Sequence, residues 1–343
     1  MTLGSAFFTL PAFIAGAIAA SLNIYALSAG ADFGGGVWDL FASGPRRDSQ
    51  RALVAEAIGP IWEANHVWLI LVIVLLFTAF PPAFALIMTL LHVPLTLMLI
   101  GIVLRGSAFT FRSYDSRRDS VQRRWGRIFA IASTATPLLL GCIVGTIASG
   151  ELSSAKLTTH VSYFETYLRP WLMPFPLGVG VMSLALFAFL AAVYLTVEAK
   201  DEKLREDFRR RAFLTAGAVA LIATLDLVVA RSSAPLVWAV LTRGSLATVL
   251  RFGAAASALG AMCWLWRRQY RGARVAAIVE VSLIIWGWAL GQFPWLVPPD
   301  ITVESAAAPV ATLRLLAIAL LVGLAVLVPS LRYLFKVFKA SSA

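Results

Sequence analysis

Nine long apolar runs, separated by short polar connections, constrain this chain more than any other feature. A helix that crosses a bilayer needs roughly 20 apolar residues. Runs of that kind lie at about 5–30, 61–80, 83–104, 128–149, 172–197, 212–230, 246–266, 275–296 and 310–331. Charged residues make up only 14% of the 343 positions, too few to cover the surface of a soluble domain. Because these runs are long and unbroken, they favour helices over a barrel, and we predict an all-α integral membrane protein with about nine transmembrane helices.

The basic residues predict the orientation of these helices. Most of the 29 lysines and arginines lie in every second connection, within 46–51, 105–127, 200–211, 267–274 and 332–339. The alternate connections hold only Lys156, Arg169, Arg231, Arg243 and Arg251. The positive-inside rule then places the N-terminus outside and the C-terminus in the cytoplasm. It also explains the net charge of +11 without a nucleic-acid partner.

The chain is expected to form one polytopic domain. Its helices are predicted to pack as two four-helix bundles plus one peripheral helix, with the first bundle at about 1–150 and the other five helices at about 151–343. Cys142 and Cys263 each lie inside an apolar run, so neither a disulfide framework nor a metal cluster is expected. The first ten residues lack a basic region, so no cleavable signal peptide is expected.

Polar residues in the first two helices are the leading functional candidates, because a charge in the bilayer is costly to bury. Asp32 precedes three consecutive glycines, which weaken a helix but let another backbone or a cofactor approach closely. Glu63 and His66 are three residues apart and share one face of the second helix. Since the two helices run in opposite directions, Asp32 and Glu63 are expected at similar depth and form a candidate proton entry. The alternative is an interfacial turn anchored by Trp62 and Trp68.

His66 and His92 raise a second possibility, that of a haem held by two histidines. His92 is expected midway along the third helix, which leaves a difference in depth of about 7 Å between the two residues. We therefore favour His92 as a packing residue. Four further polar residues are expected to be structural, with Asp226 placed to pair with Arg231; the four are Asp226, Glu280, Gln292 and Arg314.

Several of these segments resemble subunit II of the bd-type quinol oxidases. The run 30–40, GADFGGGVWDL, is similar to the first-helix motif of that family, and the run 58–69, IGPIWEANHVWL, is similar to its second-helix motif. The Phe80-Pro81 turn and the segments 291–294 and 306–314 also fit, so the resemblance spans essentially the whole chain. One departure is Ala29, at a position where members of the family often carry another aspartate.

The resemblance implies one subunit of a terminal quinol:dioxygen oxidoreductase of the respiratory chain, in the bacterial cytoplasmic (inner) membrane. The complex would oxidise a membrane quinol and reduce dioxygen to water, with haems of the b and d types held by the partner, subunit I. Subunit II would ligate no haem, support the assembly of subunit I and proton access, and in some members hold a structural quinone. We expect the isolated chain to be inactive, with no catalytic or metal-binding residue of its own. The matching positions are Asp32, Glu63 and His66 for protons, with Trp62, Asn65 and Trp68 shaping the path.

A proton-coupled secondary transporter of a small solute is the alternative, and a membrane scaffold is a third hypothesis. Transporters often bind their substrates near the midplane, at broken helices. Here the predicted acids gather toward the cytoplasmic side, which favours the oxidase subunit.

Overall fold

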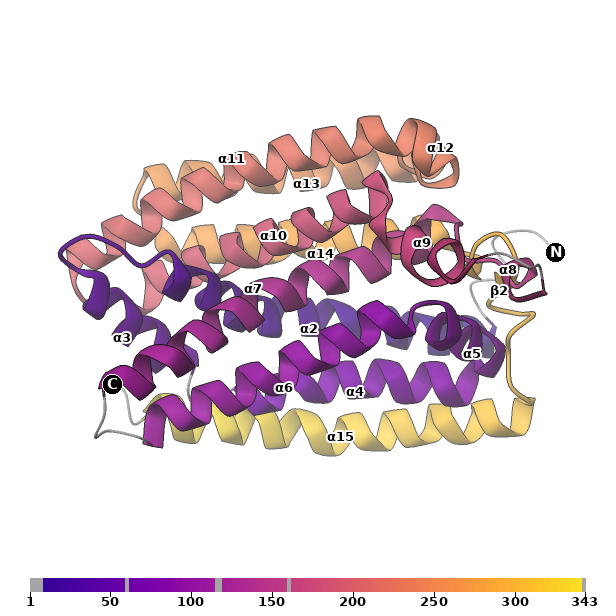
Figure 1. Ribbon diagram of the computed structural model, residues 1–343, viewed down its shortest axis with the longest axis horizontal. Coiled ribbons are helices and arrows are strands. Elements are labelled where there is room, and N and C mark those ends of the chain that lie inside the picture. Colours follow the sequence, from indigo (N-terminus) through magenta and orange to yellow (C-terminus); the bar gives the residue numbers. More distant parts are fainter. Residues whose placement is uncertain (1–8, 59–61, 115–118, 159–161, 341–343) are drawn as a thin grey trace.

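The computed structural model describes residues 9–58, 62–114, 119–158 and 162–340. Long helices lie side by side along the longest axis of the molecule (Figure 1). They are α2 (Leu10–Leu40), α4 (Trp62–Ala79), α6 (His92–Tyr114), α7 (Asp119–Ser149), α10 (Pro174–Glu198), α11 (Glu202–Ser233), α13 (Ser245–Trp266), α14 (Tyr270–Gln292) and α15 (Val310–Ala340). Shorter elements join them: α3 (Arg47–Ile58), α5 (Pro81–Leu90), α8 (Ala155–Thr158), η1 (Phe164–Leu168), α9 (Arg169–Leu172), α12 (Pro235–Thr242), β1 (Trp295–Val297) and β2 (Ile301–Thr302).

The prediction of an all-α membrane protein with about nine spans is confirmed. Eight of the described helices are long and apolar enough to cross a bilayer, and α4 with α5 forms a bent pair that gives nine if it counts as one span. The division into two bundles stays a prediction.

The third helix differs from its prediction. The chain bends by 118° between α4 and α5, where Pro81 and Pro82 follow Phe80. Proline has no backbone N–H and cannot continue a helix from the preceding turn, so α4 ends there. The spanning helix α6 begins only at His92, and the predicted range 83–104 is therefore wrong in its bounds.

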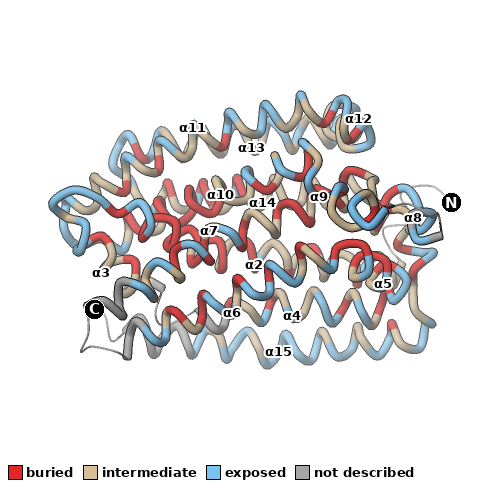
Figure 2. Tube along the Cα trace, in the orientation of Figure 1, coloured by how far each residue is buried: buried red, intermediate tan, exposed pale blue. Residues whose placement is uncertain are grey.

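Three helices, α2, α7 and α10, make up the most buried part of the molecule (Figure 2). The glycines of α2 explain how these helices approach one another so closely. A Cβ added to Gly34 would lie 1.9 Å from the carbonyl oxygen of Phe187 in α10, and one added to Gly36 would lie 2.2 Å from Cβ of Ser133 in α7. Small residues are typical of close helix contacts in membranes, where the drive for association is packing rather than expulsion of water. The predicted close backbone approach is confirmed.

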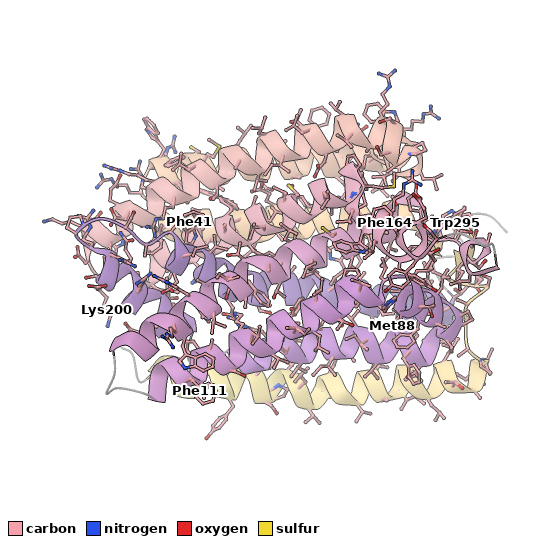
Figure 3. The ribbon with its side chains drawn as sticks, in the orientation of Figure 1. Phe41, Met88, Phe111, Phe164, Lys200 and Trp295 are labelled. Carbon is pink, nitrogen blue, oxygen red and sulfur yellow. The ribbon has the colours of Figure 1, made fainter. Side chains whose placement is uncertain are left out.

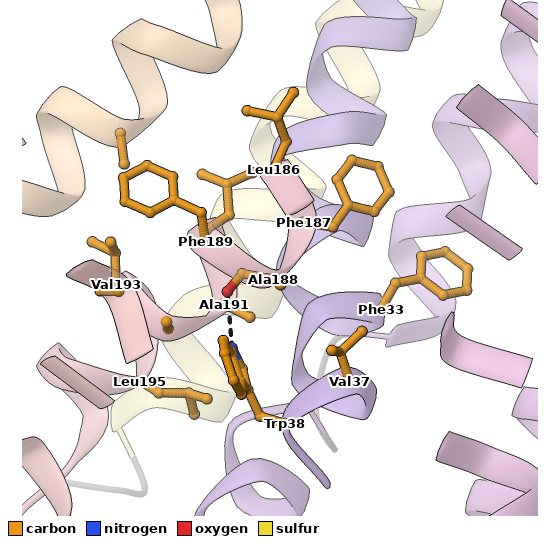
Figure 4. Close-up of a cluster of buried hydrophobic side chains, with 14 of the residues drawn as sticks. Phe33, Val37, Trp38, Leu186, Phe187, Ala188, Phe189, Ala191, Val193 and Leu195 are labelled. Atoms are coloured by element: carbon orange, nitrogen blue, oxygen red, sulfur yellow. Dashed lines mark hydrogen bonds between the residues drawn. The ribbon is translucent and has the colours of Figure 1, made fainter. Parts of the chain in front are cut away.

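The same contact carries a hydrogen bond across the helices. Trp38 Nε1 in α2 donates to the carbonyl oxygen of Ala188 in α10 at 2.8 Å (Figure 4). This bond satisfies a polar group inside a cluster of Phe33, Phe187 and other buried apolar side chains.

The helices α11 and α13 on one side of the molecule, and α15 on the opposite side, are much less buried (Figure 2). Large apolar side chains on them are exposed: Leu214, Leu221, Leu225, Val228, Val249, Phe252, Leu259, Trp266, Leu315, Leu321, Val322 and Val326. In a membrane-spanning chain such surfaces face lipid or another apolar subunit.

Basic side chains gather at one end of the bundle, the end that carries Lys200 (Figure 3). Arg46 binds Asp207 through two hydrogen bonds of 2.6 and 2.8 Å, which joins the connection after α2 to the start of α11. The short helix α3, which the sequence analysis treated as a loop, lies at this end (Figure 1).

The opposite end is closed by the hairpin β1–β2 and the segment that follows it. The two strands are antiparallel, and Val303 N donates to Pro294 O at 2.8 Å. Ala308 N donates to Ala79 O, also at 2.8 Å, and so satisfies a carbonyl at the broken end of α4.

Candidate functional site

A buried polar cluster joins α2 to α4. Asp32 is 7% exposed, and Asn65 is 5% exposed. The side-chain amide Nδ2 of Asn65 donates a hydrogen bond to Oδ2 of Asp32. The two predicted motifs therefore meet inside the membrane-spanning part of the bundle. The side chains of Trp62 and Glu63 lie outside the described part of the chain, so the placement of Glu63 beside Asp32 stays a prediction.

His66 and Trp68 continue the cluster along α4. His66 is half-buried, and its ring centroid lies 6.2 Å from that of Tyr25 and 6.3 Å from that of Phe33. Trp68 is buried in the main apolar core. Three of the predicted positions, Asp32, Asn65 and His66, thus belong to one place in the structure.

Arg105 is the charge that the sequence analysis misplaced. It was expected in a cytoplasmic loop, yet it lies in α6 and is only 1% exposed. Its Cζ atom lies 4.7 Å from the ring centroid of Phe33 and 5.4 Å from that of Phe129. A guanidinium held between two aromatic rings gains cation–π attraction and loses its water. Among the described residues, no acceptor bonds its Nε or Nη2 atoms.

Tyr25 is the second residue that the sequence analysis missed. It is 1% exposed and stands seven residues before Asp32, so both side chains lie on the same face of α2. That spacing was the signal available in the sequence. For Arg105, the signal was the apolar stretch 107–111, which continues beyond the arginine and allows α6 to extend past it.

The chemistry of the site follows from these placements. A carboxyl group, an amide, a phenol and a guanidinium, all buried, lie within a few side chains of one another and of the half-buried imidazole of His66. Asp32 and Arg105 interact electrostatically. In a medium of low dielectric constant, an arginine that keeps its charge favours an anionic group nearby. Such a cluster can hold a proton on the carboxyl or the imidazole and pass it on.

The remaining intramembrane carboxyl groups are isolated. Asp226 does not pair with Arg231 in any ion pair of the described residues; its Oδ1 packs on Gly178 of α10, where an added Cβ would lie 1.9 Å away. The predicted pair is therefore wrong, because the carboxylate turns toward a neighbouring helix instead of along its own. Glu280 is 5% exposed, and its Oε2 has no hydrogen-bond partner in the described part of the chain.

The other two residues of this group sit near helix ends. Gln292 Nε2 donates to Leu296 O at 3.0 Å, across the end of α14. Arg314 is exposed near the start of α15.

His92 was predicted midway along a helix, but it is the first residue of α6. Its Nδ1 lies 2.9 Å from Thr89 O, and its Nε2 lies 3.1 Å from the hydroxyl of Tyr163. Thirteen residues of α6 separate it from Arg105, about 20 Å along the axis. Since Arg105 and His66 both contact Phe33, one haem iron cannot bind both histidines.

The described residues also show whether metal ligands gather anywhere and whether the two cysteines are paired. Among them, no three His, Cys, Asp or Glu side chains lie close enough together to hold a metal ion. Cys142 and Cys263 are free thiols, as their positions predicted.

The fold and the cluster define a class: multi-pass helical membrane proteins with ionisable groups buried between their spans. Comparison with known proteins gives the family. Residues 10–338 match the family model described as cytochrome bd terminal oxidase subunit II, and the chain belongs to that family. It is a subunit II of a bd-type quinol oxidase in respiration, and nothing in the matches supports the transporter alternative.

Individual relatives agree with this assignment. The chain is 22% identical over 325 residues to the putative cytochrome bd menaquinol oxidase subunit II of Bacillus subtilis (strain 168), which covers 92% of this chain and 91% of the relative. It is 30% identical over 179 residues to the cytochrome bd-I ubiquinol oxidase subunit 2 of Escherichia coli (strain K12), covering 52% and 46%. Its fold is similar to a chain of the bd oxidase from Geobacillus thermodenitrificans, with a TM-score of 0.76, 22% identity, and coverage of 96% and 99%.

Proposed function

We propose that this chain supplies proton access to an oxidase whose haems, of the b and d types, belong to subunit I. The complex would oxidise a membrane quinol and reduce dioxygen to water in the bacterial cytoplasmic (inner) membrane. The chain itself would ligate no haem, could hold a structural quinone, and would be inactive when isolated. Reduction of dioxygen consumes protons, which need ionisable groups or water to cross the apolar part of the bilayer.

The buried Asp32–Asn65 hydrogen bond, beside Arg105, is the observation that carries this proposal. A carboxylate with no role would be replaced at little cost by an apolar residue, whereas here an amide orients it and a buried cation accompanies it. The amide leaves the second carboxylate oxygen of Asp32 available to a proton donor. Asp32 would thus accept a proton and release it while remaining in place.

Glu63 and His66 would form the approach to Asp32. Glu63 lies two residues before Asn65 in α4, on the side of the basic end, and it shares a helix face with His66. Trp62, Asn65 and Trp68 would shape this approach. Since Ala29 replaces the second aspartate found in related sequences, Asp32 would be the sole carboxylate of α2 at this depth.

The orientation is also a proposal. The basic end of the bundle would face the cytoplasm, so that α2 begins outside and α15 ends inside. Protons would then enter from the cytoplasmic side, past Glu63, and turnover would consume cytoplasmic protons. A cysteine-accessibility test of the connection at 200–201 in right-side-out and inverted vesicles would decide the orientation.

The principal experiment replaces Asp32 by asparagine in the intact oxidase. Asp32→Asn preserves the shape and one hydrogen bond but removes the exchangeable proton, so quinol oxidase turnover is expected to fall roughly 100-fold, the usual range for a lost acid–base group. Haem content is expected to stay near that of the wild type. Asp226→Asn is the matched control, because it makes the same change at a carboxylate outside the cluster. Wild-type turnover in Asp32→Asn would remove Asp32 from the path.

Glu63→Ala tests the approach separately. We expect lower turnover with nearly intact haem content, because a proton donor is lost without a change in the core. Unchanged turnover would remove Glu63 from the path. The role of Asp32 would not be affected by that result, because Asp32→Asn tests it separately.

The assembly role is tested by deleting the chain. If it supports subunit I, the haem recovered with subunit I from membranes is expected to fall severely. Full haem content without this chain would limit its role to proton access.

A further inference from the structure

A cavity of about 470 Å³ opens at the basic end of the bundle, away from the Asp32 cluster. It lies between the end of α10, the start of α11 and the turn that joins α13 to α14. Three arginines line it, one from α11, one from the turn and one from α14: Arg205, Arg268 and Arg271.

The acids around the cavity do not neutralise all three cations. Arg205 Nη1 donates to Glu202 at 2.9 Å, and Arg268 lies 3.5 Å from the same carboxylate and 3.6 Å from Glu206. Arg271 belongs to no ion pair among the described residues. In the part of the chain that the structure describes, no carboxylate lines the cavity, so the described wall is positively charged.

Two buried polar atoms of the lining have no partner. Arg205 Nε and the hydroxyl of Tyr270 are both closed to solvent, and neither is bonded to any described residue. The Arg205 guanidinium lies 5.4 Å from the Tyr270 ring centroid, which holds the two side chains together. Buried donors without acceptors are costly, and a small rotation of either side chain toward the cavity would bring its donor to an anion or ordered water there.

The backbone at the cavity favours an anion as well. The helix α14, of 23 residues, begins at Tyr270, and no side chain caps it. The first N–H groups of a helix lack internal partners and carry a partial positive charge. Arg268 adopts φ 59°, the left-handed region that favours glycine after a helix end. An arginine therefore occupies a position where glycine would be less strained.

We propose that this cavity binds a phosphate group, presented by the headgroup of an anionic phospholipid. Guanidinium groups and a helix N-terminus match the oxygens of a phosphate. The adjacent α13 face is apolar and exposed, and Trp264 and Trp266 stand in its last turn, where tryptophans typically mark the membrane interface. Acyl chains would lie along α13 while the headgroup enters the cavity. The proposal is independent of the proton path.

The test uses the purified oxidase complex in nanodiscs of phosphatidylcholine with phosphatidylglycerol. After extraction into mild detergent, native mass spectrometry counts the phosphatidylglycerol that stays bound. Arg271→Gln is expected to reduce this retention roughly fivefold, the factor that corresponds to one arginine at a lipid surface. Arg267→Gln, which removes the same charge four residues earlier, at the end of α13 and outside the cavity lining, is the matched control and is expected to retain the wild-type amount.

Arg268→Gly separates binding from folding. Glycine relieves the left-handed backbone, so this variant is expected to keep or raise thermal stability while it loses phosphatidylglycerol. Equal retention in the wild type, Arg271→Gln and Arg268→Gly would overturn the site.

Inorganic phosphate distinguishes the two sources of the group. In detergent without phospholipid, Arg271-dependent binding of inorganic phosphate, together with no retention of phosphatidylglycerol, would overturn the lipid assignment and make soluble phosphate the ligand. Retention of phosphatidylglycerol that millimolar phosphate does not displace would support the lipid.

Discussion

The helices α2, α7 and α10 pack their side chains against other parts of this chain, whereas α11, α13 and α15 expose many of theirs on its surface. In the first group, glycines bring backbones into contact, and a tryptophan bonds across helices. In the second, large apolar side chains project outward along the apolar part of each helix, which in α11 covers 214–228. The membrane-spanning windows of the two groups are comparably apolar, so apolarity alone does not distinguish a packed core from a lipid-facing surface.

The buried polar residues are also of two kinds, although this difference does not follow the same helices. Asp32 on α2 has an amide partner, aromatic neighbours and a buried cation near it. Asp226 on α11 and Glu280 on α14 have neither a cation nor an amide bonded to them among the described residues. Burial alone does not connect a carboxyl group to other polar groups, since Glu280 is as buried as Asp32; the connection also needs polar side chains on the helices packed against it. Variants placed in the packed centre, each with a control among the exposed helices, therefore test whether the two parts of the molecule differ in this way.

The largest effect is expected from Gly34→Leu in the packed centre. The first atom of the new side chain would overlap the carbonyl oxygen of Phe187, and only a movement of α10 could relieve this. We expect almost no assembled complex in membranes, measured by haem absorbance and blue-native electrophoresis. Gly217→Leu on α11, where an added Cβ meets no atom within 4 Å, is the control and is expected to assemble normally. Equal assembly of the two variants would show that the packed centre is no more constrained than the outer layer.

Arg105→Met is expected to have the next largest effect. Removing the cation is expected to cost about 1–3 kcal/mol, because the buried carboxylate of Asp32 loses the charge that interacts with it electrostatically and the Phe33 and Phe129 rings lose a packed neighbour. The melting temperature and the turnover of the complex are both expected to fall. Arg314→Met, which removes an exposed arginine of α15, is expected to change neither. A melting temperature of Arg105→Met equal to that of the wild type would mean that Arg105 is not part of the cluster.

The spans were predictable because each needs an apolar run of a certain length, and that property is local. The break after residue 80 was predicted as well, since 61–80 and 83–104 were placed as separate spans with the Phe80-Pro81 turn between them. The separate short helix α5 was not predicted, because 81–90 is as apolar as the span that follows it. Pro81 and Pro82 were the local signal for the break. The 118° bend and the start of α6 at His92 depend on how α5 packs beneath the hairpin at the same end.

The site was predictable only in part, for a related reason. Asp32, Asn65 and His66 stand in two motifs of adjacent helices, and opposite helix directions place them at one depth. Arg105 joins them through Phe33 and Phe129, which are far from it in sequence, so no spacing rule connects the three. The partner of Asp226 was missed in the same way, because Gly178 lies on another helix.

Glu280→Gln tests the isolated carboxyl groups, and a small effect is expected. The change keeps the shape of the side chain and removes an ionisable group that has no hydrogen-bond partner on Oε2 in the described structure. Turnover is expected to stay within about twofold of the wild type, far less than the usual loss of an acid–base group. A loss as large as that expected for Asp32→Asn would place Glu280 on a proton path and end the distinction between connected and isolated carboxylates.

The smallest effect is expected outside the membrane, at Asp300 beside the hairpin. Burial works to raise the pKa of this carboxyl, but hydrogen bonds from Ser154 N at 3.0 Å and from the Ser153 and Ser154 hydroxyls lower it below its usual value. A group whose pKa is lower in the folded state stabilises the fold above its unfolded pKa, near 3.9, and loses that contribution as the pH falls through the folded value. Because Asp300 is exposed, solvent screening leaves roughly half a kcal/mol or less. Asp300→Asn is therefore expected to make cleavage near the hairpin slightly faster at pH 7 and to have a smaller effect at about pH 3, measured by limited proteolysis with proteases suited to each pH. A difference of the same size at the lower pH would mean that the carboxylate charge does not hold the hairpin to the connection after α7.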